Sequence, residues 1–173
     1  MAGRAAAAGR GEPGQWVMLV YRLPREPSTP RIAVWRKLKR LGVAQLADGL
    51  VALPADARTR EQLEWIADEI VEAGGAAGVW IARPAAASQE RERAGAMVAA
   101  RAAEYQAVIT EAVAGDVVNE AGRASLARRL RAELRRIARR DYFPPPEREL
   151  ARAAVEALVT PHPRGSAKSD DLE

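Results

Sequence analysis

The sequence of 173 residues contains no cysteine and a single histidine, His162. Without cysteine the chain has no disulfide, no thiolate metal site and no cysteine nucleophile. One histidine close to the C-terminus also argues against a multi-histidine metal site or a histidine-based catalytic triad inside the fold. No apolar run approaches the ~18 residues that a membrane span requires.

Lysine is scarce, because only three of the 27 basic residues are lysine and the rest are arginine. Arginine makes planar, bidentate contacts to phosphate and carboxylate groups. An arginine-rich genome produces the same bias, so both explanations stay open. The distribution of charge is more informative: residues 21–43 and 123–152 each carry +6, whereas residues 44–83 carry −4 and 84–122 carry −3. Two basic blocks around an acidic middle indicate a polyanionic partner, most often nucleic acid.

Short apolar runs and amphipathic stretches alternate over the first half of the chain. We expect strands at 16–23, 43–47, 50–54 and 76–83, and helices at 31–41 and 58–73. Gly42 is expected to end the first helix, and Asp48–Gly49 is typical of a type I′ hairpin turn. The resulting order predicts an α+β fold with a ferredoxin-like βαββαβ core over residues 16–84.

Alanine-rich helical patterns follow this core. They predict a helical extension over residues 88–160, with helices at 89–113, 125–140 and 147–159. Residues 1–15 lack the apolar segment of a signal peptide, so we expect a disordered arm and a cytoplasmic protein. Residues 161–173 are expected to form a disordered tail that includes His162.

Two arginine-rich segments are the candidate nucleic-acid-binding residues. The first set is Arg22, Arg25, Arg31, Arg36, Lys37, Lys39 and Arg40, and the second is Arg128, Arg129, Arg131, Arg135, Arg136, Arg139 and Arg140. Contacts of such residues to phosphates give affinity that falls steeply with salt. Two alternatives remain open: a solvated helix face for the first set, and for the second a helix docked on the acidic middle of the chain through Glu61, Glu64, Asp68 or Glu72.

Catalytic chemistry has little support in the sequence. No Asp or Glu occurs in residues 16–25, so two-metal hydrolysis would lack its first ligand on the opening strand. The four tryptophans, Trp16, Trp35, Trp65 and Trp80, fall one on each of four core elements and are expected to pack in the core. We therefore expect no enzyme activity, no metal and no cofactor.

Several strings are more specific than these periodicities. They are YRLPREPS at 21–28, the basic helix at 31–42, GLVALPA at 49–55, Trp65 followed by Gly74–Gly75, and RRIARRDYFPPPERELARAAVEAL at 135–158. On these strings, residues 16–160 resemble the N-terminal domain of the chromate-resistance regulator family, often called chromate resistance protein B. The resemblance supplies no residue motif for DNA contact, so the two basic sets above are predicted from charge.

The resemblance implies a DNA-binding transcriptional regulator of chromate-efflux genes that binds their promoter and responds to chromate. Family members commonly carry a second, C-terminal domain associated with chromate sensing. This chain stops at Glu173 before such a domain, so we expect either a standalone N-terminal protein or a truncated one. A homodimer is compatible with a regulator that reads two half-sites.

Chromate is a tetrahedral dianion that needs fixed N–H donors or arginines. The candidate positions are residues 27–31 with Arg22 or Arg25, and the second basic set; the alternative is that sensing belongs to the second domain. The alternative function, from another class, is a protein-interaction module whose arginine-rich helix docks on an acidic partner.

Overall fold

The computed structural model describes residues 14–115 and 119–160, which form two compact units. Unit 1 consists of Met1–Arg101 and Ala138–Pro145, and unit 2 of Ala102–Ile137 and Pro146–Glu173. The sequence places the boundary at residues 84–88, whereas the units divide at Arg101, inside a long helix. The predicted disordered arm, except for its last two residues, and the predicted tail with His162 lie outside the described residues.

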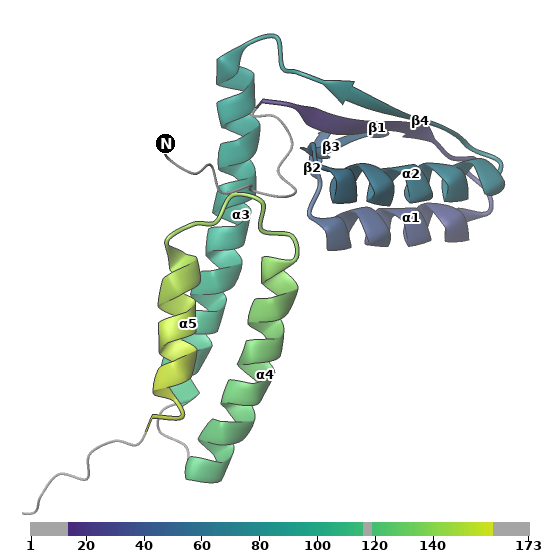
Figure 1. Cartoon of the computed structure of the whole chain (residues 1–173). Coiled ribbons are helices and arrows are strands. Elements are labelled where there is room, and N and C mark those ends of the chain that lie inside the picture. Colours follow the sequence, from purple (N-terminus) through teal and green to yellow (C-terminus); the bar gives the residue numbers. More distant parts are fainter. Residues whose placement is uncertain (1–13, 116–118, 161–173) are drawn as a thin grey trace, which may run out of the picture. The chain divides into compact units, whose positions relative to one another are not determined.

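Unit 1 contains a four-stranded antiparallel sheet with two helices on one face (Figure 1). Its elements follow the predicted order, and the sheet order is β2-β3-β1-β4. The elements are β1 (Trp16–Arg22), α1 (Ser28–Leu41), β2 (Ala44–Ala47), β3 (Leu50–Pro54), α2 (Ala57–Glu72) and β4 (Ala76–Ala82). The predicted mixed α/β class is therefore confirmed.

The core of unit 1 lies between the sheet and its two helices. Val17 and Leu19 alternate along β1 toward the helices and are fully buried, as the two-residue period of a strand requires. Val34 and Leu38 of α1 pack against them. So does an apolar stripe of α2 that consists of Leu63, Ile66 and Ile70. Because these apolar stripes face the sheet, the polar side chains of both helices are directed outward.

Local hydrogen bonds explain where α1 ends and where α2 begins. Gly42 ends α1 as expected, in the left-handed conformation with φ 70°, and its N–H bonds the carbonyls of Leu38 and Lys39. α2 begins with a capping box, in which Asp56 accepts a 2.7 Å bond from the Thr59 N–H and the Thr59 hydroxyl accepts a 3.0 Å bond from the Asp56 N–H.

The β2–β3 hairpin is present, but its turn is not type I′. That turn needs positive φ at both central residues, and among the described residues no non-glycine residue has positive φ, so only Gly49 (φ 71°) meets the requirement. The pairing of β2 with β3 also contains a register shift between Gln45 and Ala47. The Tyr21 N–H donates a 2.7 Å bond to the Gly49 carbonyl, so the turn lies against the end of β1.

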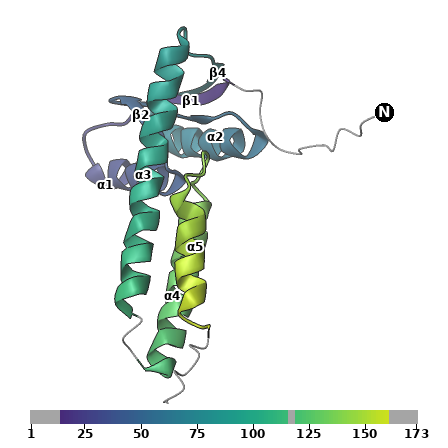
Figure 2. The same cartoon turned by 90° about the vertical axis from the view of Figure 1, so that its left-hand side faces the viewer.

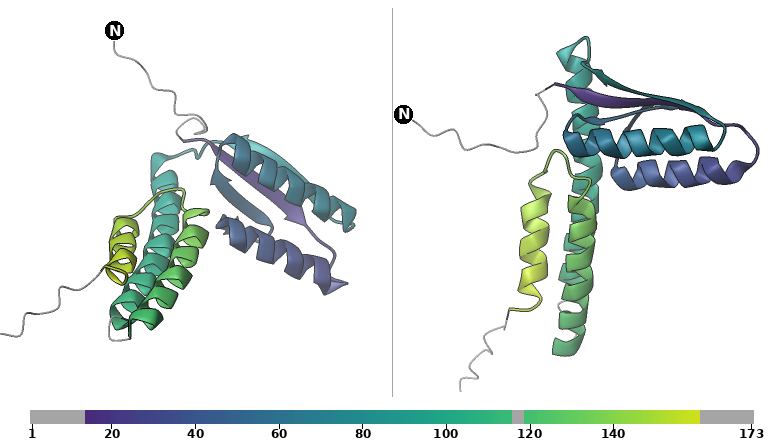
Figure 3. Two further views of the ribbon diagram at one scale, coloured as in Figure 1. Left: turned by 60° about the horizontal axis from the view of Figure 1, so that its bottom comes forward. Right: turned by 45° about the vertical axis from the view of Figure 1, so that its right-hand side comes forward.

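Unit 2 is a helical packing of the second half of α3 (Ala87–Ala114) with α4 (Glu120–Ala138) and α5 (Glu147–Ala157) (Figures 2 and 3). Its core includes Tyr105, Val108, Leu130, Ile137 and Val155, all almost fully buried.

α4 begins five residues before the predicted position. The side chain of Asn119 accepts a 2.9 Å bond from the Gly122 N–H and caps the helix there. The helix also ends earlier than predicted, at Ala138. Arg139 and Arg140 therefore belong to the following turn and to unit 1, not to α4. Within residues 14–115 and 119–160, no helix combines the length and apolar character needed to cross a membrane.

Candidate nucleic-acid interface

The first basic set lies entirely in unit 1, at the end of β1 and along α1. Five of its arginines are exposed and make no ion pair or hydrogen bond within the described part of the chain: Arg22, Arg25, Arg31, Arg36 and Arg40. The two lysines are engaged, since Lys37 pairs with Glu69 of α2 and the Lys39 ammonium lies 4.5 Å from the centre of the Trp35 ring. The arginines of this surface thus remain available to an external anion.

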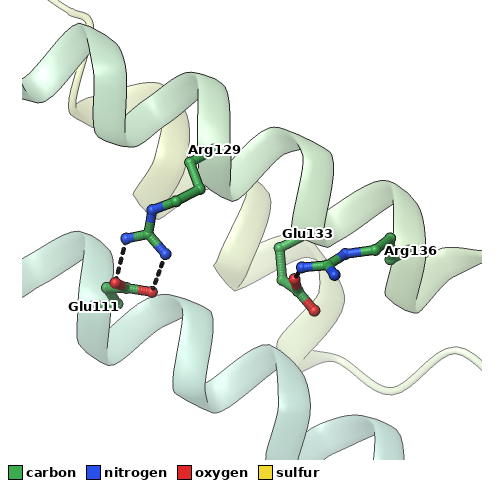
Figure 4. A network of polar contacts seen from close by, with 4 residues as sticks. All are labelled: Glu111, Arg129, Glu133 and Arg136. Atoms are coloured by element: carbon green, nitrogen blue, oxygen red, sulfur yellow. Dashed lines mark hydrogen bonds and ion pairs between the residues drawn. The ribbon is translucent and has the colours of Figure 1, made fainter.

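Three of the seven arginines of the second basic set pair with carboxylates inside unit 2. Arg129 forms a two-pronged ion pair with Glu111 of α3, and Arg136 pairs with Glu133 one turn before it (Figure 4). Arg131 holds Glu156 of α5 with bonds of 2.8 and 3.1 Å.

These pairs affect ionisation and bear on one of the two alternatives given for the second set. The hydrogen bond from Arg131 lowers the pKa of Glu156, and the matching bonds raise the pKa of both Arg129 and Arg131. The carboxylate partners of Arg129, Arg131 and Arg136 lie on α3, α5 and α4, and the alternative partners Glu61, Glu64, Asp68 and Glu72 are not among them. Only Arg128 and Arg135 of α4 are exposed without such a partner in the described residues.

The last two arginines of the second set belong to unit 1. Segment 138–145 lies against the end of α1, because the Tyr142 hydroxyl donates a 2.8 Å bond to the carbonyl of Leu41. A Cβ built on Gly42 would stand 2.9 Å from the Cβ of Arg140. Arg140 therefore lies beside the end of α1 that follows Arg40, although the two arginines are far apart in the sequence.

A cleft of about 750 Å³ opens between α1, the end of β1 and the β2–β3 turn. Its lining includes three members of the first basic set, Arg22, Arg31 and Arg36, together with Trp35 and Asp48. Tyr21 also lines it, and burial, followed by the nearby Asp48 carboxylate, raises the pKa of its hydroxyl, which Arg31 partly offsets. The phenol therefore stays neutral at physiological pH and can donate a hydrogen bond.

The tryptophans correct the expectation that all four pack in the core. Trp16 does, with 5% of its surface exposed, but Trp35, Trp65 and Trp80 are 50%, 62% and 64% exposed. Sequence reasoning thus missed Trp35 as a site residue. The signal was available, because Trp35 stands beside the apolar stripe of α1 and not on it.

Acidic side chains do not gather into a metal site in the part of the chain that is described. Within those residues, no group of three or more His, Cys, Asp or Glu side chains is placed to hold an ion.

Comparison with known proteins gives consistent matches. The family model described as "Protein ChrB, N-terminal" matches residues 31–162. Protein ChrB of Cupriavidus metallidurans is 31% identical over 174 aligned residues, which cover 88% of this chain and 50% of the relative. The chain thus spans about half the length of the curated relative it matches. No solved structure matches it.

Proposed function

The chain belongs to the ChrB N-terminal family, and from that membership together with its basic surface we propose that it is a DNA-binding transcriptional regulator of chromate-resistance genes. It acts without catalysis or cofactor, in the cytoplasm, where promoter DNA lies. The observation that carries the proposal is the group of exposed, unpaired arginines on unit 1.

Five arginines of the first set are exposed and have no carboxylate partner within the described residues, whereas Arg129 of the second set pairs with Glu111. Arg36 and Arg40 are four residues apart and so lie on the same side of α1. Guanidinium groups at this spacing can follow successive phosphates of a duplex, and backbone contacts of this kind fix the protein's position on DNA.

The proposal ranks the two basic sets. Three arginines of α4 already neutralise carboxylates of unit 2, so binding DNA through them would break ion pairs. We therefore assign the main DNA contacts to the five exposed arginines of the first set, together with Arg139, and a weaker contribution to Arg128 and Arg135.

A matched pair of double variants tests this ranking. Arg25→Gln with Arg40→Gln removes two exposed, unpaired arginines from unit 1, and Arg128→Gln with Arg135→Gln removes two from α4, with the same change in net charge. Fluorescence anisotropy with promoter duplex DNA at low salt is expected to show a larger loss of affinity for the first variant, about tenfold or more. Equal losses would mean diffuse attraction to net charge, and no DNA binding by the unmodified chain would favour an acidic protein partner.

For unit 1 we further propose the ferredoxin-like fold. Read from the other edge, the sheet order is β4-β1-β3-β2. Each helix then links two strands with a third between them, β1 to β2 through α1 and β3 to β4 through α2, as in a split βαβ arrangement. An experimental structure with a different strand order would contradict this assignment.

Chromate is the proposed effector. A tetrahedral dianion can occupy arginines that otherwise hold DNA phosphates, so chromate would release the DNA by competition. Arg22, Arg25 and the start of α1 offer such contacts in unit 1. DNA-binding titrations should then show release by chromate at concentrations where sulfate of equal ionic strength has no effect. If both anions act equally, the effect is ionic screening and this chain lacks its own sensor.

We also propose that two copies pair through β4, the strand at one edge of the sheet. Its sequence contains no charge or proline, the features that usually protect a free edge. Trp80 and Ile81 on this strand are 64% and 50% exposed. Antiparallel pairing with the same strand of a second copy joins the two sheets about a two-fold axis.

A further inference from the structure

The cleft of unit 1 offers more than a surface for backbone phosphates requires. Arg22, Arg31 and Arg36 supply positive charge, Trp35 supplies a flat apolar ring, and Asp48 is the only carboxylate among the described residues of the lining. Its volume of about 750 Å³ falls within the ~300–1,000 Å³ range of small-molecule sites. A bare tetrahedral anion would bridge the arginines but leave the ring and the carboxylate without contacts. The best-fitting ligand therefore carries several chemical groups.

Trp35 identifies one of those groups. Half of its surface is exposed, and the residue lines the cleft. The Lys39 ammonium stands over the ring at 4.5 Å, so a second ring would stack on the ring face that the ammonium leaves open. Stacking of a nucleobase on an aromatic side chain strengthens binding by roughly five- to a hundredfold and is tolerant of base identity.

The other lining groups match the remainder of a nucleotide. Guanidinium groups are the preferred partners of phosphate oxygens. Asp48 can accept a hydrogen bond from a sugar hydroxyl or an exocyclic amino group. A base within a duplex is stacked on both sides and cannot reach Trp35, so the base must be unpaired.

We propose that this cleft binds one unpaired nucleotide, with its phosphate at Arg22, Arg31 and Arg36, its base on Trp35 and a hydrogen-bond donor at Asp48. The nucleotide can be a free mononucleotide or an unpaired position in a strand. The proposal does not rest on duplex binding, because Arg25 and Arg40, which test that function, lie outside the cleft lining.

Isothermal titration calorimetry with dAMP, deoxyadenosine and inorganic phosphate tests the cleft in the full chain. We expect dAMP to bind more tightly than either half of the molecule. Trp35→Leu should weaken dAMP binding about tenfold or more. Trp65→Leu, at a similarly exposed tryptophan of α2 outside the cleft, should change it less than twofold. Arg22→Gln with Arg31→Gln should weaken both dAMP and phosphate.

A six-nucleotide single strand and a blunt duplex then identify the source of the ligand. Tighter binding of the single strand than of dAMP identifies an unpaired position in a strand, and equal binding identifies a free nucleotide; both support the cleft. The proposal is overturned if dAMP does not bind, if phosphate alone binds as tightly, or if the two tryptophan variants behave alike. None of these outcomes depends on whether Arg25→Gln with Arg40→Gln alters duplex binding.

Discussion

Tyr142 ties the segment after α4 to the end of α1 by a hydrogen bond from its hydroxyl. Its hydroxyl donates to the Leu41 carbonyl, one of the last carbonyls of α1, which lack a partner within the helix. Its ring packs on the core of unit 1, and Arg58 stands 6.0 Å from the ring centre. This one side chain thereby helps hold Arg139 and Arg140 in the same unit as the first basic set.

Tyr142→Phe is expected to lower the free energy of unfolding by about 1 kcal/mol, since the partly buried Leu41 carbonyl loses its partner. The thermal midpoint should fall by roughly 2–4 °C for a chain of this size. Circular dichroism melts will measure it. Tyr21→Phe is the control, because the Tyr21 hydroxyl makes no hydrogen bond in the described residues. Equal midpoints for both variants would contradict the assigned bond.

Tyr142 also makes stability depend on pH at the alkaline end. Burial, the largest cause, raises its pKa to about 12 from the ordinary 10.0. The folded state therefore favours the neutral phenol, and the associated stability is fully present below pH 10.0 and is lost as pH rises toward about 12. In Tyr142→Phe this contribution should be absent from the pH profile of the melting midpoint.

Among the elements, the helices and strands of unit 1 follow directly from the sequence. The stripes of α1 and α2, the Gly42 stop and the apolar run of β1 predict their boundaries to within about three residues. The predicted boundaries of the helices in unit 2 are less accurate. α4 begins at the Asn119 cap, upstream of the apolar residues, such as Leu130, from which the helix is predicted. α4 ends two residues before the predicted end, at Ala138, ahead of the proline-rich segment 144–146.

The sequence predicts which arginines belong to the candidate site, but not which of them are paired. Charge alone identified the arginines, but the pairing of Arg129 with Glu111 depends on how α3 and α4 pack, which periodicity does not reveal. The cleft depends on the β2–β3 turn standing beside α1. Asp48 and Arg31 line the same cleft only because of that tertiary arrangement.

The same turn gives a prediction at the scale of the hairpin. Gly49 and Gly74 both have positive φ, 71° and 78°, but a Cβ on Gly49 would stand 2.3 Å from the Tyr21 carbonyl oxygen, whereas nothing lies within 4 Å at Gly74. Gly74→Ala should destabilise by about 1 kcal/mol from backbone strain alone. Gly49→Ala should cost clearly more, because the turn must also move off β1. Urea denaturation of both variants measures the difference. Equal midpoints would contradict the close approach of Gly49 to the Tyr21 carbonyl oxygen.

For the whole molecule, the edge strand gives the prediction for assembly. Trp80→Lys places a charge on β4 at a side chain that is 64% exposed, so the fold should tolerate it while edge pairing does not. Analytical ultracentrifugation should show dimers for the unmodified chain and monomers for this variant. Trp65→Lys on α2, 62% exposed, is the control and should remain dimeric. A monomeric unmodified chain would rule out β4 pairing.

The central claim, that the exposed arginines of unit 1 hold duplex DNA through its phosphates, is tested most directly by the salt dependence of binding. Each phosphate contact contributes about −0.9 to the slope of log affinity against log salt. If the five unpaired arginines of the first set all engage, the slope should be about −4 to −5. It should become shallower by about 2 in Arg25→Gln with Arg40→Gln. A slope near zero, or one unchanged by that double substitution, would contradict the account.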